Sequence, residues 1–155
     1  MTACDWTVVG SIATALAVLV AACQVYRGTL QVRTNFEDEL SREYRELARC
    51  IPVKAHLGDL LSPDEFDQAF PSLYQYIDLT NEQIFLRMND RISRATWLNW
   101  QDGIKSNLGR PTFAQAWALI KKDATESFTE LRKLEVNGFS DDPRKWVAAW
   151  KRLCR

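Results

Sequence analysis

The apolar residues of this chain are concentrated in one uninterrupted run near its N-terminus. From Trp6 to Tyr26 the sequence is WTVVGSIATALAVLVAACQVY, with no ionisable side chain before Arg27. A helix of about 20 apolar residues matches the roughly 30 Å hydrocarbon core of a bilayer. Aromatic rings at both ends of such a helix suit the level of the lipid headgroups. The pattern predicts a single transmembrane helix over residues 5–27.

The residues that flank the run predict its orientation. Asp5 precedes the run, whereas Arg27 and Arg33 follow it. The positive-inside bias therefore predicts an N-terminus outside and a cytoplasmic C-terminal domain. The alternative is a lipoprotein signal peptide, because Val20-Ala21-Ala22-Cys23 resembles a lipoprotein cleavage box. Since no Lys or Arg precedes the run, we expect an uncleaved anchor.

Small residues recur along one side of the predicted span. Gly10, Thr14, Ala17 and Ala21 are 4, 3 and 4 positions apart, which places them on one stripe of a helix. Small side chains let membrane helices approach one another closely. We therefore expect a homo-oligomer, with the alternative that these residues reflect only the ordinary composition of spans.

After the span, the apolar positions follow helical spacing, and no polar–apolar alternation long enough for a sheet occurs. Residues 28–51 lack proline and predict a membrane-proximal connecting helix, a rod that continues from the span and ends before Pro52. The remaining residues, 52–155, are expected to form a compact cytoplasmic helical domain that senses a ligand. The predicted fold class is all-α.

Start and stop signals divide the domain into helices. Ser62-Pro63-Asp64-Glu65 combines an N-cap hydroxyl, a proline at N1 and acids in the first turn. Asn89-Asp90 and Asn137-Gly138 are breakers. The expected helices run from Ser62 to Phe70-Pro71, from Ser72 to Asn89, from Ser93 to a left-handed cap at Gly109, from Thr112 towards Leu134, and from Pro143 onwards.

Aromatic residues on the apolar faces of these helices are expected to form the core. Stacking platforms for nucleic-acid bases are the alternative interpretation. Trp100 fits the core least well, because its neighbours Asn99 and Gln101 are polar. The expected core aromatics are Trp97, Trp100, Phe113, Trp117, Phe128, Trp146 and Trp150.

Composition argues against most catalytic chemistry. The 155 residues carry 20 Lys+Arg against 20 Asp+Glu, so the chain lacks the net positive charge expected of a protein that binds duplex nucleic acid. His56 is the single histidine, which leaves a histidine metal centre or a Ser-His-Asp relay poorly supported. Cys4, Cys23, Cys50 and Cys154 have no Cys-x-x-Cys spacing. We expect a non-enzyme without catalytic residues, metal site or cofactor.

One segment has a local excess of positive charge. Between positions 87 and 110 there are five basic residues against two acidic ones. Arg87, Arg91 and Arg94 would share a helical face if the break at Asn89-Asp90 were mild. The turn Lys105–Arg110 offers free backbone N–H groups and flexible cations, which suit phosphates. The predicted ligand site is Arg91, Arg94, Lys105, Asn107 and Arg110; the alternative is a solvated helix end with ordinary surface charges.

The run YIDLTNEQIFLRMNDRISRATWLNWQDGI, followed by RPTFAQAW, resembles the core of small bacterial membrane proteins in which one span precedes a compact helical domain. The resemblance covers roughly residues 70–120 and the layout of the anchor. Its matching positions are Trp97, Trp100, Gly103, Pro111, Phe113 and Trp117. The size and layout also resemble CRISPR-associated membrane effectors of type III systems, which respond to cyclic oligoadenylate.

This second resemblance implies a homotetramer whose cytoplasmic domain binds cyclic tetra-adenylate and whose activated form impairs the host membrane during phage infection. It carries over no individual site residue. A tetramer could bind the four phosphates of cyclic tetra-adenylate with the same one or two cationic side chains from each subunit. The alternatives are a membrane-tethered interaction or scaffold protein, and a small toxin whose span alone disrupts membranes.

Overall fold

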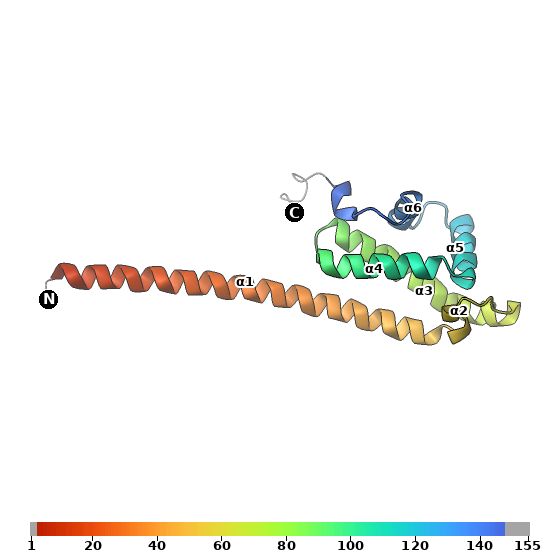
Figure 1. Ribbon diagram of the computed structural model, residues 1–155, viewed down its shortest axis with the longest axis horizontal. Helices are drawn as coiled ribbons and strands as arrows, with labels where there is room; N and C mark the ends of the chain where they lie inside the picture. The colour runs from red at the N-terminus through yellow and green to blue at the C-terminus, as the bar shows by residue number, and fades with distance from the viewer. Residues whose placement is uncertain (1–2, 148–155) are drawn as a thin grey trace. The chain divides into compact units, whose positions relative to one another are not determined.

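The computed structural model describes residues 3–147, and this part of the chain is helical with no strand (Figure 1). By its internal contacts the chain divides into two units, with the boundary between Phe36 and Glu37. The predicted all-α class is confirmed. The helices are α1 (Ala3–Cys50), α2 (Val53–Leu57), α3 (Pro63–Met88), α4 (Arg94–Leu108), α5 (Pro111–Asp123) and α6 (Thr129–Val136), followed by a 3-10 turn, η1 (Pro143–Trp146).

The first unit contains the apolar part of α1. Within the described residues, α1 provides one helix that is long and apolar enough to cross a membrane. Every side chain from 10 to 32 is exposed to the surroundings, and Val25 has an exposed fraction of 71%. The Thr14 hydroxyl donates to the carbonyl of Gly10 at 2.9 Å, which satisfies this polar group without water. Trp6 and Asp5 lie where side chains are not described.

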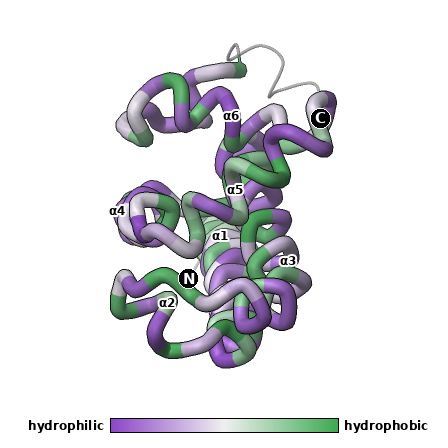
Figure 2. The backbone as a smooth tube through the Cα atoms, turned by 90° about the vertical axis from the view of Figure 1, so that its right-hand side faces the viewer, coloured by the Kyte–Doolittle hydropathy of each residue, from purple (hydrophilic) through white to green (hydrophobic). Residues whose placement is uncertain are grey.

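The second unit is built around α3, which packs against α5, α6 and η1, while α4 packs against α5. Figure 2 shows that hydrophobic and hydrophilic residues are interspersed along its helices, as in amphipathic helices. The core forms where the apolar faces meet, and Leu73, Ile77, Trp97, Phe113 and Leu131 are fully buried there.

Most of the predicted core aromatics are confirmed. Trp97, Phe113, Trp117 and Phe128 are buried, and the rings of Trp117 and Phe128 meet edge to face with centroids 6.0 Å apart. Two predicted core residues are only half-buried: Trp146, and Trp100, which has polar neighbours on α4. Trp150 and Cys154 lie outside the described residues.

The predicted start of α3 is confirmed. The Ser62 hydroxyl accepts from the N–H of Glu65, and the Glu65 carboxylate accepts from the N–H of Ser62, so the two residues form a capping box. Lys54 donates to Glu65 at 2.8 Å. Hydrogen bonds from Lys54 and then from Ser62 lower the pKa of Glu65 to about 2. The Glu65 carboxylate of the capping box therefore stays ionised over the physiological pH range.

The predicted helix break at Phe70-Pro71 is wrong, because α3 continues through Pro71 to Met88. A proline inside a helix removes one backbone hydrogen bond and crowds the preceding turn. Buried side chains lie on both sides of it, Phe66 and Ala69 before and Leu73 and Ile77 after. Burial of this continuous apolar face outweighs the local cost of the proline.

The expected helix from Thr112 to Leu134 is also wrong. It is divided into α5, which begins one residue earlier at Pro111, and α6, which begins at Thr129. The Arg132 guanidinium fills the gap, donating to the carbonyls of Lys121, Ala124 and Ser127 at 2.9–3.0 Å. A side chain from the next helix thus satisfies carbonyls that a continuous helix would have used itself.

Four further expectations concern where helices begin and end. The backbone of Gly109 has a right-handed helical conformation (φ −77°), so the predicted left-handed cap is wrong. The chain therefore leads from α4 towards α5 without a left-handed residue at Gly109. The breaks at Asn89-Asp90 and Asn137-Gly138 are confirmed, with positive φ at Asp90 and Gly138. The helix expected from Pro143 is a single 3-10 turn as far as the described residues reach.

A buried ion pair holds η1 against α3. Arg87 has an exposed fraction of 1% and donates to both carboxylate oxygens of Asp142, at 2.8 and 2.6 Å. It also donates to the carbonyl of Ile92 at 2.7 Å. Burial opposes ionisation of Asp142, but hydrogen bonds from Arg87 and from the N–H of Arg144 keep its pKa below the usual value. Arg87 is therefore a structural cation.

Candidate ligand pocket between α1, α3 and α4

A cavity of about 370 Å³ lies in the second unit, between the last turns of α1 and the helices α3 and α4. Its volume falls at the small end of the range of about 300–1,000 Å³ for small-molecule sites. The side chains that matter for its chemistry are Ser41, Tyr44, Arg45, Gln83, Trp100 and Ile104, with Gly103 in the α4 wall.

One end of the contact between α1 and α4 is held by Glu37. Its carboxylate accepts from the N–H of Ser93 at 2.5 Å, and also from the hydroxyls of Ser93 and Thr96. Ser93 is the predicted N-cap of α4 and is confirmed as such. The N-terminus of a helix favours a carboxylate, because its backbone N–H groups are unpaired and its dipole end is positive. Glu37 therefore fixes α1 beside the first turn of α4.

The other end is closed by a buried polar network. Asn107 has an exposed fraction of 4% and donates to the hydroxyls of Tyr76 at 2.8 Å and Tyr44 at 3.4 Å. Its carbonyl oxygen accepts from Arg110. Burial raises the pKa of Tyr76 to about 12, so its hydroxyl stays protonated. The Asn107 side chain is therefore engaged in hydrogen bonds within the fold, and the ligand contact predicted for it stays a prediction.

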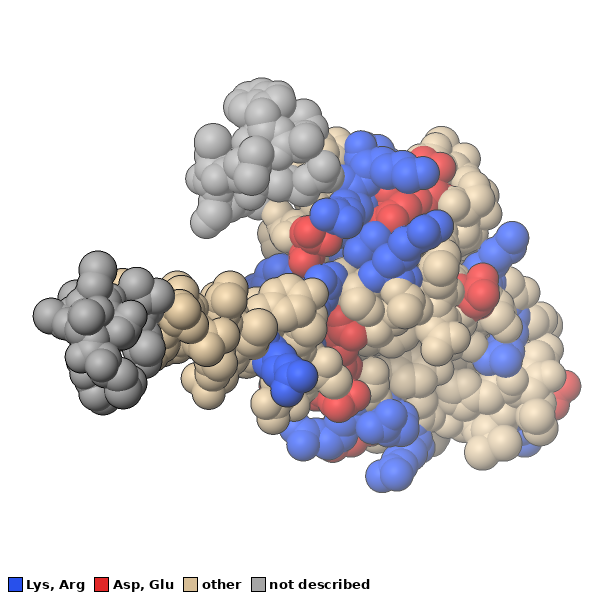
Figure 3. Space-filling view, turned by 60° about the vertical axis from the view of Figure 1, so that its left-hand side comes forward, with Lys and Arg blue, Asp and Glu red and all other residues tan. Residues whose placement is uncertain are grey.

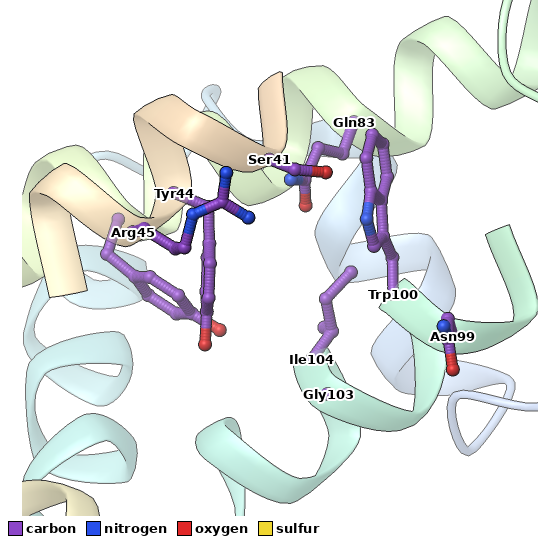
Figure 4. A pocket seen from close by; sticks show the side chains of 9 residues that line it. Ser41, Tyr44, Arg45, Gln83, Asn99, Trp100, Gly103 and Ile104 are labelled. Carbon is purple, nitrogen blue, oxygen red and sulfur yellow. The ribbon is translucent and has the colours of Figure 1, made fainter. Parts of the chain in front are cut away.

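The walls of the cavity have two different faces. Tyr44 and Arg45 stand on one side, and Gln83 and Trp100 project from the other, with Ile104 between them (Figure 4). Asn99 points away from this space (Figure 4). The cavity thus combines flat aromatic surface, one amide and one cation, a combination that suits a planar ligand with polar edges and a negative group.

Gln83 stands out among the lining residues. Its exposed fraction is 5%, and its amide has no hydrogen-bond partner among the groups that the structure describes. Arg45 is exposed and forms no ion pair within the same part of the chain. The amide atoms of Gln83 are not among the fully enclosed polar atoms that lack a partner, so the amide faces the cavity and is open to water or a ligand there.

The predicted site residues are not brought together. Arg91 and Arg94 are exposed at the start of α4, whereas Lys105 and Arg110 lie at and beyond its end. At 1.5 Å per residue, Arg94 and Lys105 are about 16 Å apart along the helix. Asn107 and Arg110 alone are in contact. Basic side chains form several separate groups on the surface, with acidic ones among them (Figure 3).

The face proposed for Arg87, Arg91 and Arg94 does not exist either. The helix ends at Met88, and Asp90 adopts a left-handed conformation that turns the chain before Arg91. Arg87 is buried against Asp142 on the inner side of this turn. The break at Asn89-Asp90 is therefore abrupt, and it sets the buried Arg87 apart from the exposed Arg91 and Arg94.

Sequence reasoning missed Gln83 and the residues of α1. Gln83 occupies a core position of α3, since Tyr76, Thr80 and Arg87 lie on the same buried face. A polar residue at core spacing was the signal that could have identified it. Ser41, Tyr44 and Arg45 give no such signal, because only the packing of α1 beside α3 and α4 brings them to the cavity.

His56 and the described cysteines do not add a second site. The imidazole Nε2 lies 3.0 Å from the carbonyl of Ala48, and the ring packs against Phe113. His56 is half-buried, as expected for an ordinary histidine. Cys23 and Cys50 are free and exposed, and the described residues include no cluster of His, Cys, Asp or Glu that could hold a metal ion.

Comparison of the chain with protein-family models, with curated proteins and with solved structures finds no match.

The structure predicts that Gly103 is not required for folding. A Cβ atom at this position would meet nothing within 4 Å, and glycine in a helix interior is less stable than alanine. We expect Gly103→Ala to raise the free energy of unfolding by about 0.5–1 kcal/mol, measured by urea denaturation. Gly109→Ala is the matched control, since its Cβ would lie 3.3 Å from the Lys105 carbonyl. A smaller gain is expected there, and a loss of stability in Gly103→Ala would contradict the open wall.

Proposed function

We propose that this protein is a membrane-anchored antiviral effector of the type III CRISPR kind. Its cytoplasmic helical domain binds cyclic tetra-adenylate, and the bound protein perturbs the bacterial inner membrane. The observation that supports this proposal most directly is the composition of α1. One helix contains both the apolar segment suited to a bilayer and the residues Ser41, Tyr44 and Arg45 of the cavity wall.

The proposed mechanism uses this shared helix. A ligand in the cavity touches the last turns of α1, so its binding energy acts on the helix that carries the membrane segment. A ligand can shift such an equilibrium only by binding one arrangement more tightly than another. In a homotetramer, four such helices meet through the stripe Gly10, Thr14, Ala17 and Ala21, and a change in their packing opens or disorders the bilayer.

The proposal predicts ligand-dependent leakage. The full-length protein is reconstituted into lipid vesicles that contain a self-quenched dye, and cyclic tetra-adenylate is added on the side of the helical domain. We expect dye release to rise by at least tenfold over the basal rate, because the ligand favours the perturbing arrangement; a tenfold change corresponds to about 1.4 kcal/mol of differential binding.

Linear tetra-adenylate of the same length is the matched control, since it carries the same bases without the closed ring. Release that is equal with and without the cyclic ligand, in vesicles shown to contain correctly inserted protein, would overturn the proposed function. Release without any ligand would instead indicate the toxin alternative, in which the span alone disrupts membranes.

A further inference from the structure

Gln83 offers a donor and an acceptor side by side, and no side chain or backbone group that the structure describes uses them. The N–H₂ and C=O of a glutamine amide can pair at once with a group that presents an acceptor beside a donor. Adenine presents this arrangement at N7 and its 6-amino group, and Gln or Asn pairs with it in a bidentate manner. The unpaired donor and acceptor of the Gln83 amide therefore match the N7 and 6-amino edge of an adenine base.

Trp100 lies beside Gln83 on the same side of the cavity (Figure 4). It is only half-buried, so part of its indole is open to a ligand. Stacking of a base on an aromatic side chain contributes about 1–3 kcal/mol and tolerates any base. Trp100 would supply affinity for a flat ring, and Gln83 would supply the choice of base.

Arg45 stands across the cavity on α1 and forms no ion pair within the described residues. A guanidinium has five N–H donors in a planar fork, which suits two oxygens of a phosphate. Arg45 is exposed, so a phosphate held by it remains at the mouth of the cavity, where water reduces the cost of desolvation.

The fourth feature of the cavity is that a ligand can approach the backbone of α4 at Gly103. Gly103 lies on the α4 wall with open space where a side chain would be. Glycine is the residue that lets a ligand approach the backbone closely, although it is unfavourable inside a helix. A cavity of about 370 Å³ is too small for a whole cyclic tetranucleotide and suits one nucleotide unit of it.

We propose that the cavity between α1, α3 and α4 is an adenine-nucleotide pocket: Trp100 stacks on the base, Gln83 pairs with its N7 and 6-amino edge, and Arg45 binds the phosphate. The inference rests on the proposed function for the identity of the larger ligand, but the pocket takes one adenylate unit whether or not that unit belongs to a ring.

The test uses the full-length protein in lipid nanodiscs and adenosine 5′-monophosphate as the probe, with binding followed by calorimetry and by tryptophan fluorescence. Gln83→Met keeps the length of the side chain and removes the amide, and we expect at least about tenfold weaker binding. The matched control is Gln68→Met, an exposed glutamine on the same helix, for which affinity stays the same.

The base and the phosphate are tested separately. Purine riboside 5′-monophosphate lacks the 6-amino group. We expect it to bind the wild type at least about tenfold more weakly than adenosine monophosphate does. In Gln83→Met, which has no amide to pair with the 6-amino group, we expect the two nucleotides to bind equally well. Adenosine lacks the phosphate. We expect the preference for the monophosphate over adenosine to disappear in Arg45→Ala and to persist in Arg42→Ala, which removes a neighbouring exposed cation.

Absence of adenosine monophosphate binding to the wild type at millimolar concentration would overturn the pocket assignment, as would equal affinity in Gln83→Met and Gln68→Met. These outcomes are separable from the proposed function. If cyclic tetra-adenylate causes leakage but the wild type does not bind the monophosphate, the pocket is wrong and the effector function stands. If the monophosphate binds as described but the cyclic ligand causes no leakage, the pocket stands and the effector function fails.

Discussion

Replacing Asp142 with alanine should lower the free energy of unfolding by about 3 kcal/mol, because it leaves the Arg87 guanidinium buried without its main partner. Arg87 is 1% exposed, and both oxygens of Asp142 accept from it. Removal of one member of a buried ion pair costs about 3–5 kcal/mol. We expect the lower end, because Asp90 remains 3.8 Å from the guanidinium. Urea denaturation followed by circular dichroism measures the loss.

The double variant Arg87→Met/Asp142→Ala distinguishes the cost of a buried, unpaired charge from the cost of lost packing contacts around η1. It leaves no buried cation, so its loss of stability should be smaller than that of Asp142→Ala alone. An equal or larger loss in the double variant would show that packing around η1, and not the uncompensated charge, accounts for the effect. Asp67→Ala, an exposed acid on α3, should change stability by less than about 0.5 kcal/mol.

The same pair predicts a pH dependence. The pKa of Asp142 is lower in the folded protein than its value of 3.8 in the unfolded chain. The stability that the ionised carboxylate contributes is therefore complete well above pH 3.8 and is lost as the pH falls through the folded-state pKa. The difference in stability between the wild type and Asp142→Ala should be constant near neutral pH and shrink below pH 3.8.

Two arginines in the apolar segment of α1 should release the protein from membranes. Leu16 and Leu19 lie near the middle of the apolar run and are exposed, with exposed fractions of 57% and 62%. An arginine at the centre of a span costs about 2.5–3.5 kcal/mol, so the variant Leu16→Arg/Leu19→Arg should cost about 5–7 kcal/mol of insertion energy. The measurement is the fraction of protein that stays in the membrane pellet after an alkaline carbonate wash.

The matched control places two arginines at exposed leucines of the second unit, Leu98 on α4 and Leu119 on α5. This variant should stay with the membrane as the wild type does. Recovery of the wild type in the aqueous fraction would contradict the prediction that α1 anchors the protein in a membrane. A double-arginine variant that resists the wash would show that another surface holds the protein at the membrane.

Local chemistry was enough to predict several features of the fold. Ser62 and Ser93 are helix caps because their hydroxyls accept from N–H groups only a few residues away. The breaks at Asn89-Asp90 and Asn137-Gly138 arise in the same way, from residues that tolerate a left-handed backbone. Such signals involve neighbours in the chain, so the sequence contains them whatever the tertiary structure.

Other features depended on distant residues. Pro71 did not break α3 because side chains before and after it are buried together, and α5 ended at Asp123 where Arg132 reaches back to its last carbonyls. In both places a tertiary interaction outweighed the local preference. The residues of the predicted ligand site lie apart within one chain for a related reason, since the length of α4 separates Arg94 from Lys105.

The sequence by itself determined that this protein has an apolar helix long enough to cross a bilayer and an all-helical remainder, because length, composition and periodicity decide both. Only the tertiary structure decided where a ligand could bind. Arg45, Gln83 and Trp100 belong to three separate helices, and only packing encloses them around a common cavity and leaves the amide of Gln83 without a partner.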